Sequence, residues 1–557
     1  MVTLMKLFSS LMALIIAFIG NVYMLGINLV KSYEFDIDTT QTSTTLHNPA
    51  SNVNVWSISG NPFVNAKNNE KYDVFDFVDY VQFMQCTGGS ADRDLFIDPY
   101  DKSVMDDYDF SMLIDNCRGV LNLGAKPMLK LGSVPLKYSS KGTSDNFFGT
   151  NIYPPDDYNM YYNYMKAIIE ALVEEFGHEE VLSWRFGVMT EYENSDWFMA
   201  ESGNPQESAI EYCKLYDYTV AALTDVLGNE VFVGAHSMTV SEGLWDEAYF
   251  IKHCAKGRNY KTGKIGTRIC YLSASFYDMG PGKYSLGLTL PETIDYLRNT
   301  AEKVGLNSLI FGIDEGRILS GTESGIGSSA LLSRTCGYTY QAAYDARLYK
   351  QMFENDINYF SSWSFLTGGI IEGIPTISYH VAKHASEFGG AKLVKTNLSS
   401  KGLISFGEVE AISAYNEDAE SVYIMAYNFK NSLKYKTKAD VRLIINIPQF
   451  DSDTVMITTS VIDDDCNFFD EWNKDRETYN IGNDCFNWSP DDPCVETTTT
   501  LFDSNARQFY FNNRYRYEEC ATLTPVEETC KVEGGKIELN ATIEANTVIF
   551  YKITLCK

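Results

Sequence analysis

Apolar runs of strand length alternate with amphipathic helical patterns over residues 53–390 of this chain. Runs that are apolar throughout and separated by helices are typical of a parallel sheet that is buried on both faces. Eight such units predict a (β/α)₈ barrel. The expected strands are Val53–Ile58, Tyr80–Cys86, Pro127–Gly132, Leu182–Met189, Val231–Ala235, Ile269–Ser275, Leu309–Ile313 and Tyr359–Phe365.

The helix between the third and fourth strands has the clearest pattern. Apolar residues in 156–176, from Met165 to Phe176, recur at i, i+3 and i+4 and therefore share one face of a helix. Gly177 follows, as expected where a helix ends. A second helical run, Ala382–Phe388, is expected to close the last unit of the barrel.

The pattern changes at about residue 395, where short runs of alternating apolar and polar residues begin. Such runs predict an antiparallel β-sandwich over 395–557. The barrel domain is expected to cover 31–394, although Tyr33–Thr40 alternates too, so that 31–50 is an alternative part of the sandwich. The expected sandwich strands are Val422–Tyr427, Asp440–Ile447, Val455–Ile462, Gln508–Phe511 and Thr547–Leu555.

The N-terminus predicts export. Lys6 is followed by 24 uncharged residues, Leu7–Val30. The apolar run Leu7–Gly20 fits a signal peptide, but no Ala-x-Ala cleavage site follows. The whole uncharged stretch is long enough to span a bilayer. Residues 1–30 are therefore expected to be a signal peptide or a signal anchor, and the protein to be secreted or held outside the cell by residues 7–30.

Cysteines and glycosylation triplets agree with export. The chain has twelve cysteines, and in an exported chain an even cluster of cysteines predicts a disulfide framework, although six allow fifteen pairings. The C-terminal six are Cys466, Cys485, Cys494, Cys520, Cys530 and Cys556. Asn-x-Ser/Thr triplets begin at Asn397, Asn487 and Asn540, which predicts a glycoprotein.

Charge excludes some partners. The formal net charge is −29, from 45 basic and 74 acidic residues, so nucleic acid and anionic membranes would be repelled. The 37 Tyr, 32 Phe and 7 Trp suit the stacking of sugar rings instead. No metal is expected, because Asp463–Asp465 lacks the spacing of a calcium loop, and His380 and His384 lack the glutamate of a zinc motif.

Two glutamates are the main candidates for chemistry. Glu191 and Glu315 each end a strand-like run, and they lie 124 residues apart, or three units of roughly 41 residues. The ends of the fourth and seventh strands of a barrel face one another across its mouth, where two carboxylates serve glycoside hydrolysis. Asp314 is an alternative nucleophile, and Glu193 could be mistaken for the acid/base residue.

Three segments carry a resemblance to a known family. They are Phe176–Phe186 followed by Glu191 and Trp197, Tyr212–Leu223, and residues 109–135. Together they resemble glycoside hydrolase family 39, which includes β-xylosidases and α-L-iduronidases, over residues 70–390. The resemblance implies a clan A barrel and a retaining mechanism without metal or organic cofactor.

The resemblance also implies roles for single residues. Glu191 is the expected acid/base and Glu315 the expected nucleophile, which Tyr277 would orient. Trp363 is expected to stack on a sugar ring. His236 is expected either to line the pocket or to be structural.

The chain departs from the family pattern at several positions. Thr190 stands where the family has an asparagine that would bind the sugar 2-hydroxyl, and Gln82 and Met84 stand for an arginine and a histidine. The His-x-Tyr motif of the sixth strand is Ser275-Phe-Tyr277, and the lysine that iduronidases use is missing, which argues against iduronate. Two hypotheses follow: a β-xylosidase-like retaining glycoside hydrolase, or a catalytically impaired surface protein that binds carbohydrate.

Overall fold

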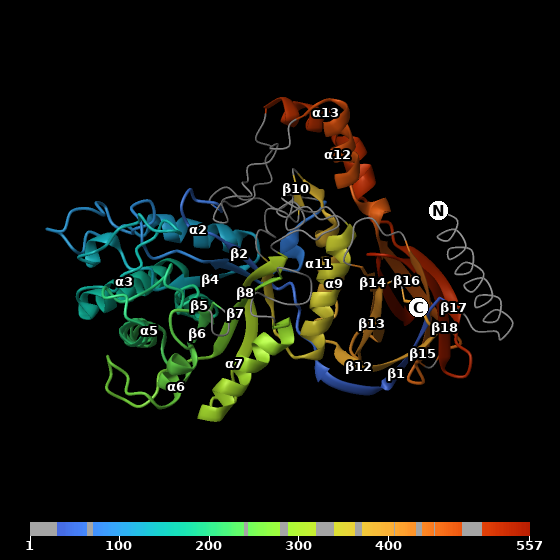
Figure 1. Cartoon of the computed structure of the whole chain (residues 1–557), viewed down its shortest axis with the longest axis horizontal. Helices are drawn as coiled ribbons and strands as arrows, with labels where there is room; N and C mark the ends of the chain where they lie inside the picture. Colours follow the sequence, from blue (N-terminus) through green and yellow to red (C-terminus); the bar gives the residue numbers. More distant parts are fainter. Residues whose placement is uncertain are drawn as a thin grey trace, which may run out of the picture.

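The computed structural model describes residues 30–63, 71–238, 243–278, 288–318, 339–362, 370–371, 373–405, 407–430, 437–450, 452–481 and 504–556. In this part of the chain, eight parallel strands close into a barrel and nine strands form a separate sheet. The barrel and the sheet lie at opposite ends of the molecule (Figure 1). The predicted (β/α)₈ barrel with a C-terminal β-domain is confirmed.

All eight predicted barrel strands are present, and each overlaps its expected run. Every strand pairs in parallel with the next, and Val53 pairs with Ser362 to close the ring. The strands are β2 (Asn52–Val55), β3 (Tyr80–Phe83), β4 (Lys126–Leu131), β5 (Arg185–Val188), β6 (Phe232–Ser237), β7 (Tyr271–Asp278), β8 (Ile310–Ile318) and β9 (Phe360–Ser362).

The helices cover the barrel with their apolar faces. In α3 the Asp157 side chain accepts from the amides of Asn159 and Met160 and so caps the first turn, and Gly177 with φ 87° ends the helix. The helices of the barrel region are α2 (Ser111–Asn122), α3 (Tyr158–Phe176), α4 (His178–Leu182), α5 (Pro205–Leu227), α6 (Ala248–Lys256), α7 (Leu290–Val304), α9 (Thr339–Glu354) and α11 (Ile377–Ser386).

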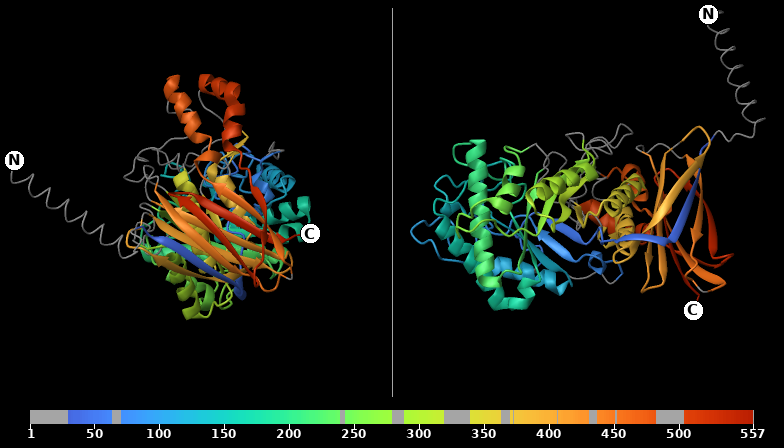
Figure 2. Two further views of the ribbon diagram at one scale, coloured as in Figure 1. Left: turned by 90° about the vertical axis from the view of Figure 1, so that its right-hand side faces the viewer. Right: turned by 90° about the horizontal axis from the view of Figure 1, so that it is seen from below.

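The C-terminal sheet folds over a core of its own. Its strand order is β17-β16-β19-β14-β13-β12-β1-β15-β18. Leu443 of β15 and Ile457 of β16, from opposite ends of this order, lie in one buried cluster, so the sheet curves into a sandwich (Figure 2). The strands are β1 (Ser32–Thr45), β12 (Lys392–Lys401), β13 (Glu408–Asn416), β14 (Ser421–Phe429), β15 (Lys438–Asn446), β16 (Thr454–Ile462), β17 (Val526–Lys531), β18 (Lys536–Glu544) and β19 (Val548–Leu555).

Strand β1 joins the N-terminal region to this sheet. It pairs antiparallel with β12 and parallel with β15. Its residues Phe35 and Ile37 are buried in the same core as Val441 of β15. The chain therefore passes through the sandwich before it enters the barrel, and residues 32–45 belong to the C-terminal sheet.

The expected strand Gln508–Phe511 is wrong, because these residues lie inside α13 (Ser504–Ala521). The helix buries Ala506, Tyr510, Tyr517 and Ala521, which recur at spacings of four and seven. They pack beside Trp472 of α12 (Phe469–Thr478) in a small separate core. A strand was expected because a run of four residues, three of them aromatic, is too short to distinguish the two periodicities.

The disulfide framework expected in the C-terminal domain is not shown among the cysteines that the structure describes. All nine carry free thiols: Cys86, Cys117, Cys213, Cys254, Cys270, Cys466, Cys520, Cys530 and Cys556. Val455 of β16 pairs with Cys530 on one side and Leu555 on the other, so β16 separates Cys530 from Cys556. Cys336, Cys485 and Cys494 lie outside the described residues.

The predicted signal peptide or anchor, residues 1–30, lies outside the described residues except for Val30. Among the helices in the described ranges, none combines the length and the apolar character needed to cross a bilayer.

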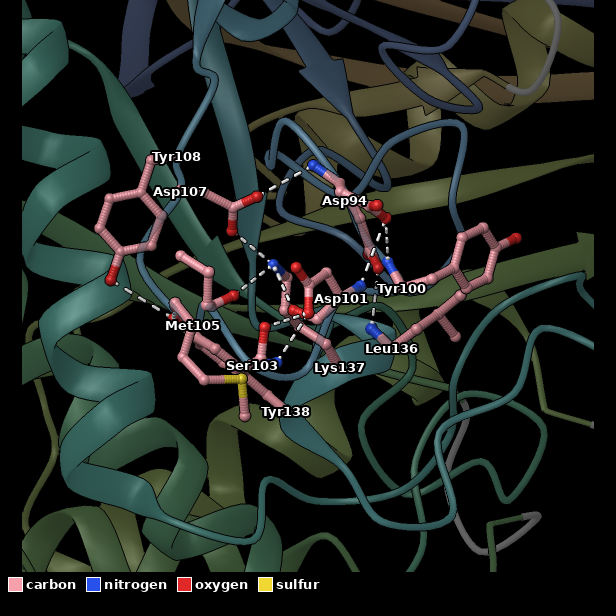
Figure 3. A network of polar contacts seen from close by, with 12 residues as sticks. Asp94, Tyr100, Asp101, Ser103, Met105, Asp107, Tyr108, Leu136, Lys137 and Tyr138 are labelled. Carbon is pink, nitrogen blue, oxygen red and sulfur yellow. Dashed lines mark hydrogen bonds and ion pairs between the residues drawn. The ribbon is translucent and has the colours of Figure 1, made fainter.

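A buried lysine braces the long loop that follows β3. Lys137 is 1% exposed, and its Nζ donates to the carbonyl of Val104 at 2.9 Å and to Asp107 Oδ1 at 2.5 Å (Figure 3). Its ammonium also lies 4.2 Å from the ring centre of Phe96. The loop after β3 is thus held against the loop after β4, both at the carboxyl ends of barrel strands.

Asp94 forms the second brace between these loops. Its two carboxylate oxygens accept from the amides of Gly89 and Leu136, each at 2.8 Å. Gly88 has φ 129°, and a Cβ there would come within 2.7 Å of Asp94 Oδ1. Burial raises the pKa of Asp94 to about 7, against the effect of its two amide donors.

The first prediction concerns the pH dependence of stability. The pKa of Asp94 is about 7 in the folded chain and 3.8 as its ordinary value. Because burial favours the protonated form, the contribution of Asp94 is fully present below its unfolded pKa and is lost as the pH rises through 7. Asp94→Asn, which cannot ionise, should show a smaller fall in melting temperature between pH 5 and pH 8 than the wild type.

Its control is Asp98→Asn, because Asp98 lies in the same loop and is exposed. The Asp94 variant also loses one amide contact, which lowers its melting temperature by a constant amount at every pH. The comparison is therefore between the slopes of melting temperature against pH. Equal slopes in the wild type and both variants would contradict the prediction.

The second prediction concerns the thiols. Protein unfolded without reductant should titrate at least nine thiols per chain with Ellman's reagent, because nine described cysteines are free. Two disulfide bridges would consume four of the twelve cysteines and leave eight. A count of eight or fewer would contradict the structure and support the disulfide framework.

Candidate active site

The first candidate carboxylate lies on a strained turn at the end of β5. Glu191 has φ 42° and Met189, two residues before it, has φ 66°. A left-handed conformation at a residue other than glycine costs about 1–3 kcal/mol and is often found at functional sites. Glu191 is 7% exposed, so its carboxyl group is enclosed by the surrounding structure.

Three side chains hold the Glu191 carboxyl group. Ser275 Oγ donates to Oε1 at 2.6 Å, and Asn194 Nδ2 donates to Oε2 at 2.8 Å. The Trp197 side chain adds a further hydrogen bond. Burial nevertheless raises the pKa of Glu191, because it disfavours the charged form more than these donors favour it.

The second candidate carboxylate lies on β8. Glu315 pairs with Ser275 across a β-bulge between Ala274 and Ser275 of β7. The Tyr277 hydroxyl, from the same strand β7, donates to Glu315 Oε1. The predicted contact between Tyr277 and Glu315 is therefore present.

The two carboxyl groups are close together. An oxygen of Glu191, an oxygen of Glu315 and a ring nitrogen of His236 all lie within 4.8 Å of one another. In glycosidases that retain configuration, the two carboxyl groups lie about 5–5.5 Å apart, which leaves no room for a water between them. Glu191 and Glu315 have this close arrangement. The expectation of no metal stays a prediction.

Asp314, the alternative nucleophile, is engaged elsewhere. It is fully buried, forms an ion pair with Lys130 and accepts from the Tyr359 hydroxyl at 2.6 Å. Burial opposes its ionisation, but the Lys130 ammonium holds the pKa of the Asp314 carboxyl below its ordinary value. The geometry therefore favours Glu315 over Asp314 as the attacking group.

Glu193, the alternative to Glu191, is buried behind the site. Its Oε1 accepts from Ser237 Oγ at 2.5 Å and from the Met238 amide at 2.8 Å. Burial, and next the nearby Glu247 carboxyl, raise the pKa of Glu193 well above its ordinary value. Glu193 is thus a buried acid that fixes the start of the loop after β6.

The remaining predicted site residues have different positions. Thr190 is 1% exposed, and its hydroxyl donates to the carbonyl of Met84 at 3.2 Å, so it supports the backbone rather than facing a ligand. His236 is fully buried, with Nε2 2.9 Å from Ser275 Oγ. Trp363 lies outside the described residues.

Sequence reasoning missed a polar layer under Glu315. The backbone carbonyl of Asp314 accepts from Asn54 Nδ2 at 3.2 Å and from Gln82 Nε2 at 3.1 Å. Lys130 completes the layer from β4. One feature of the sequence indicates this layer. Lys130 lies inside the apolar run Met128–Leu131, and a buried lysine requires a buried partner.

An apolar wall stands beside both carboxylates. Trp197, which bonds to Glu191, lies in one cluster with Met84 and with Tyr277, which bonds to Glu315. Phe148 stacks on Trp197 with ring centres 4.6 Å apart, and Trp56 lies 5.4 Å from Trp197. Aromatic faces of this kind suit the apolar faces of sugar rings.

Comparison with known proteins gives the family. The sequence model described as Glycosyl hydrolases family 39 matches residues 94–474. A β-xylosidase of Geobacillus stearothermophilus is 27% identical over 151 residues, which are 27% of this chain and 28% of that protein. A β-xylosidase of Caldicellulosiruptor saccharolyticus is 30% identical over 122 residues, or 22% and 23% of the two chains. The chain thus matches about a quarter of the length of these relatives.

Solved structures share the fold. A bacterial orthologue of human α-L-iduronidase has a TM-score of 0.63 at 13% identity, covering 95% of this chain and 84% of that one. A monomeric β-xylosidase from Caulobacter crescentus CB15 has a TM-score of 0.62 at 14% identity, covering 94% and 100%. At these identities the likeness shows the fold alone. Because the family model covers more than half of the chain, the chain belongs to glycosyl hydrolase family 39.

Proposed function

We propose that this protein is a retaining glycosidase that hydrolyses O-glycosidic bonds of an oligosaccharide or polysaccharide, with Glu191 as acid/base and Glu315 as nucleophile. The observation that carries the proposal is that carboxyl oxygens of the two residues lie within 4.8 Å of one another, Glu191 just after β5 and Glu315 on β8. Family membership and the β-xylosidase relatives support it.

The reaction follows from the different surroundings of the two groups. In the first step, Glu315 attacks the anomeric carbon and Glu191 gives its proton to the departing oxygen, so a glycosyl-enzyme ester forms as the glycosidic bond breaks. In the second step, Glu191 takes a proton from water, which attacks the same carbon and releases Glu315. Burial of Glu191 favours the protonated form that the first step needs.

Tyr277 has a separate role in this scheme. Its hydroxyl donates to Glu315 Oε1 and so fixes the orientation of that carboxylate for attack. As charge leaves Glu315 during attack, this hydrogen bond weakens, so Tyr277 serves mainly to orient the nucleophile. The ring belongs to the apolar wall with Met84 and Trp197, which limits its rotation.

We propose a β-xylosidase-like specificity for a neutral sugar. The two sequence relatives are β-xylosidases, which supports this choice. Thr190 and Ser275 replace polar residues of the family pattern, and no lysine stands in the sixth-strand motif to bind a uronate carboxylate. A sugar in this site would lie between the carboxylates and the aromatic wall of Trp197 and Phe148.

The third prediction tests the two glutamates. Glu315→Ala should reduce turnover of every glycoside to background, because no nucleophile remains. Glu191→Ala should lower kcat/KM on xylo-oligosaccharides by about 10²–10⁴-fold. It should spare the first step with an aryl glycoside such as 2,4-dinitrophenyl β-xyloside, whose leaving group needs no proton. Rates of product release measure both effects.

The control is Glu302→Ala, because Glu302 is an exposed glutamate on α7. A 2-fluoro xyloside with a good leaving group should label Glu315, as found by peptide mass mapping. Labelling of Asp314 would move the nucleophile by one residue. Full activity of Glu315→Ala, or a first product of inverted configuration, would contradict the mechanism. No release from any aryl glycoside by the wild type would favour the carbohydrate-binding alternative.

We also propose that the protein is exported and glycosylated, and either secreted or held at the membrane by residues 7–30. The uncharged segment after Lys6 supports export. Asn397 on β12 and Asn540 on β18 are both exposed, as glycan attachment requires. The free thiols of the described cysteines give this proposal no support, so it depends on the leader and the triplets.

The fourth prediction follows from this proposal. Peptide N-glycosidase should lower the apparent mass of native protein, and Asn397→Gln and Asn540→Gln should each remove one glycan. Cleavage of the leader would give an N-terminus between about residues 20 and 35. Retention would leave the protein in membranes after a high-pH wash. An unglycosylated protein in the cytosol that begins at Met1 would contradict both forms of the proposal.

A further inference from the structure

A chain of two hydrogen bonds leads from the barrel interior to the Glu191 carboxyl group. Ser275 Oγ lies 2.9 Å from His236 Nε2 and donates to Glu191 Oε1 at 2.6 Å. Ser275 and His236 are both fully buried, so water does not compete for these bonds. Their strands β6 and β7 are paired, and the Ser275 amide donates to the carbonyl of Met238 at 3.0 Å, which fixes the geometry.

The direction of the hydrogen bonds follows from the number of hydrogens. A serine hydroxyl has one hydrogen, and in this chain it goes to the Glu191 carboxylate. Ser275 Oγ must therefore accept from His236, which requires the tautomer with its hydrogen on Nε2. Burial, and next the Lys130 charge, lower the pKa of His236 to about 3, so the imidazole is neutral.

We propose that Ser275 and His236 are positioning residues, in which neutral His236 orients the Ser275 hydroxyl and this hydroxyl sets the balance between the protonated and ionised forms of Glu191. The proposal rests on the proposed function. In the family pattern that the sequence resembles, a histidine stands at the position of Ser275. Here the imidazole comes from the neighbouring strand, and a hydroxyl stands between it and the acid/base residue.

This arrangement meets opposite demands of the two steps. The first step needs Glu191 protonated and the second needs it ionised. Burial and the nearby Asp196 raise the pKa of Glu191, and Ser275, Asn194 and Trp197 lower it.

Other ionisable groups also lie close to Glu191. Glu315 faces Glu191 from β8. His236 brings no charge from β6, and Lys130 and Asp314 form their own ion pair behind it. The Ser275 donor to Glu191 is itself bonded to a second buried side chain, His236, which fixes the direction of its hydrogen. The tuning by Ser275 is therefore separable from these charges.

The fifth prediction tests the His236–Ser275–Glu191 chain of hydrogen bonds, called the relay below, through the pH dependence of the reaction rate. Ser275→Ala should move the basic limb of kcat/KM for a xylo-oligosaccharide, whose leaving group needs the proton of Glu191, upward by about one pH unit. This is the effect expected for loss of one hydrogen bond to a charged group. The acid limb of kcat should move upward too, where the second step is rate-limiting. Ser275→Thr, which keeps a hydroxyl, should restore the wild-type profile.

His236 should act only through Ser275. His236→Leu should shift both limbs in the same direction as Ser275→Ala but less. In a Ser275→Ala background it should add no further shift, because the hydroxyl through which it acts is gone. The matched control is Ser273→Ala, since Ser273 is a fully buried serine of β7 that donates to the carbonyl of Ala235 and does not contact Glu191.

The outcomes separate this inference from the proposed function. An active enzyme whose Ser275→Ala profile matches the wild type and Ser273→Ala would overturn the relay alone. A full additional shift from His236→Leu in the Ser275→Ala background would overturn the role of His236. If Ser275→Ala does not fold, Ser275→Cys, with a similar volume and a weaker donor, must show the same upward shift. Absence of turnover in the wild type overturns both the function and the relay.

Discussion

The ion pair of Lys130 and Asp314 is the constraint on which the catalytic end of the barrel depends. Both side chains are fully buried, so each charge has lost its hydration and is compensated by the opposite charge of its partner. Removal of one partner from a buried pair costs about 3–5 kcal/mol, because the other charge is left without compensation. The pair links β4 to β8 at the residue that precedes Glu315. Asn54 of β2, Gln82 of β3 and Tyr359, which directly precedes β9, add hydrogen bonds to the same aspartate.

Around the Lys130–Asp314 ion pair, the two glutamates are held by different kinds of contact. Glu315 extends from β8, which Lys130 and Asp314 hold in place, and Tyr277 from β7 limits its motion. Glu191 lies on a turn with unfavourable backbone angles at two residues. Such strain persists only where contacts offset it. Here the contacts are hydrogen bonds from Ser275, Asn194 and Trp197, which come from the barrel and from the loop itself.

The sequence predicted the parts of this molecule that depend on periodicity. All eight barrel strands and the two candidate glutamates followed from apolar runs and their spacing, although β8 continues past Glu315 to Ile318. Proposals about Asp314 and Glu193 stayed open because adjacent acids are equivalent in sequence, and only burial and partners separate them. The contacts of Ser275 with His236 join residues 39 apart, and no local pattern encodes such a pair.

What the sequence did not predict has physical reasons as well. A count of cysteines does not say which strands lie between them, and β16 lies between Cys530 and Cys556. The helix α13 was missed because its aromatic residues form a short run, whereas burial of Tyr510 and Tyr517 follows a longer helical spacing. In both cases the deciding information is long-range or extends beyond the window in which the pattern was judged.

The departures from the family pattern are compensated within the barrel. Thr190, in place of an asparagine, bonds to the carbonyl of Met84, which itself replaces a histidine, so two substitutions meet in one contact. Gln82, in place of an arginine, bonds to the backbone of Asp314 and needs no counter-charge. Neutral groups thus occupy positions where the pattern places cations or ligand-binding amides. Lys130 is the basic residue of this layer whose charge acts on Glu315, and hydrogen bonds from Ser275, Asn194 and Trp197 adjust Glu191.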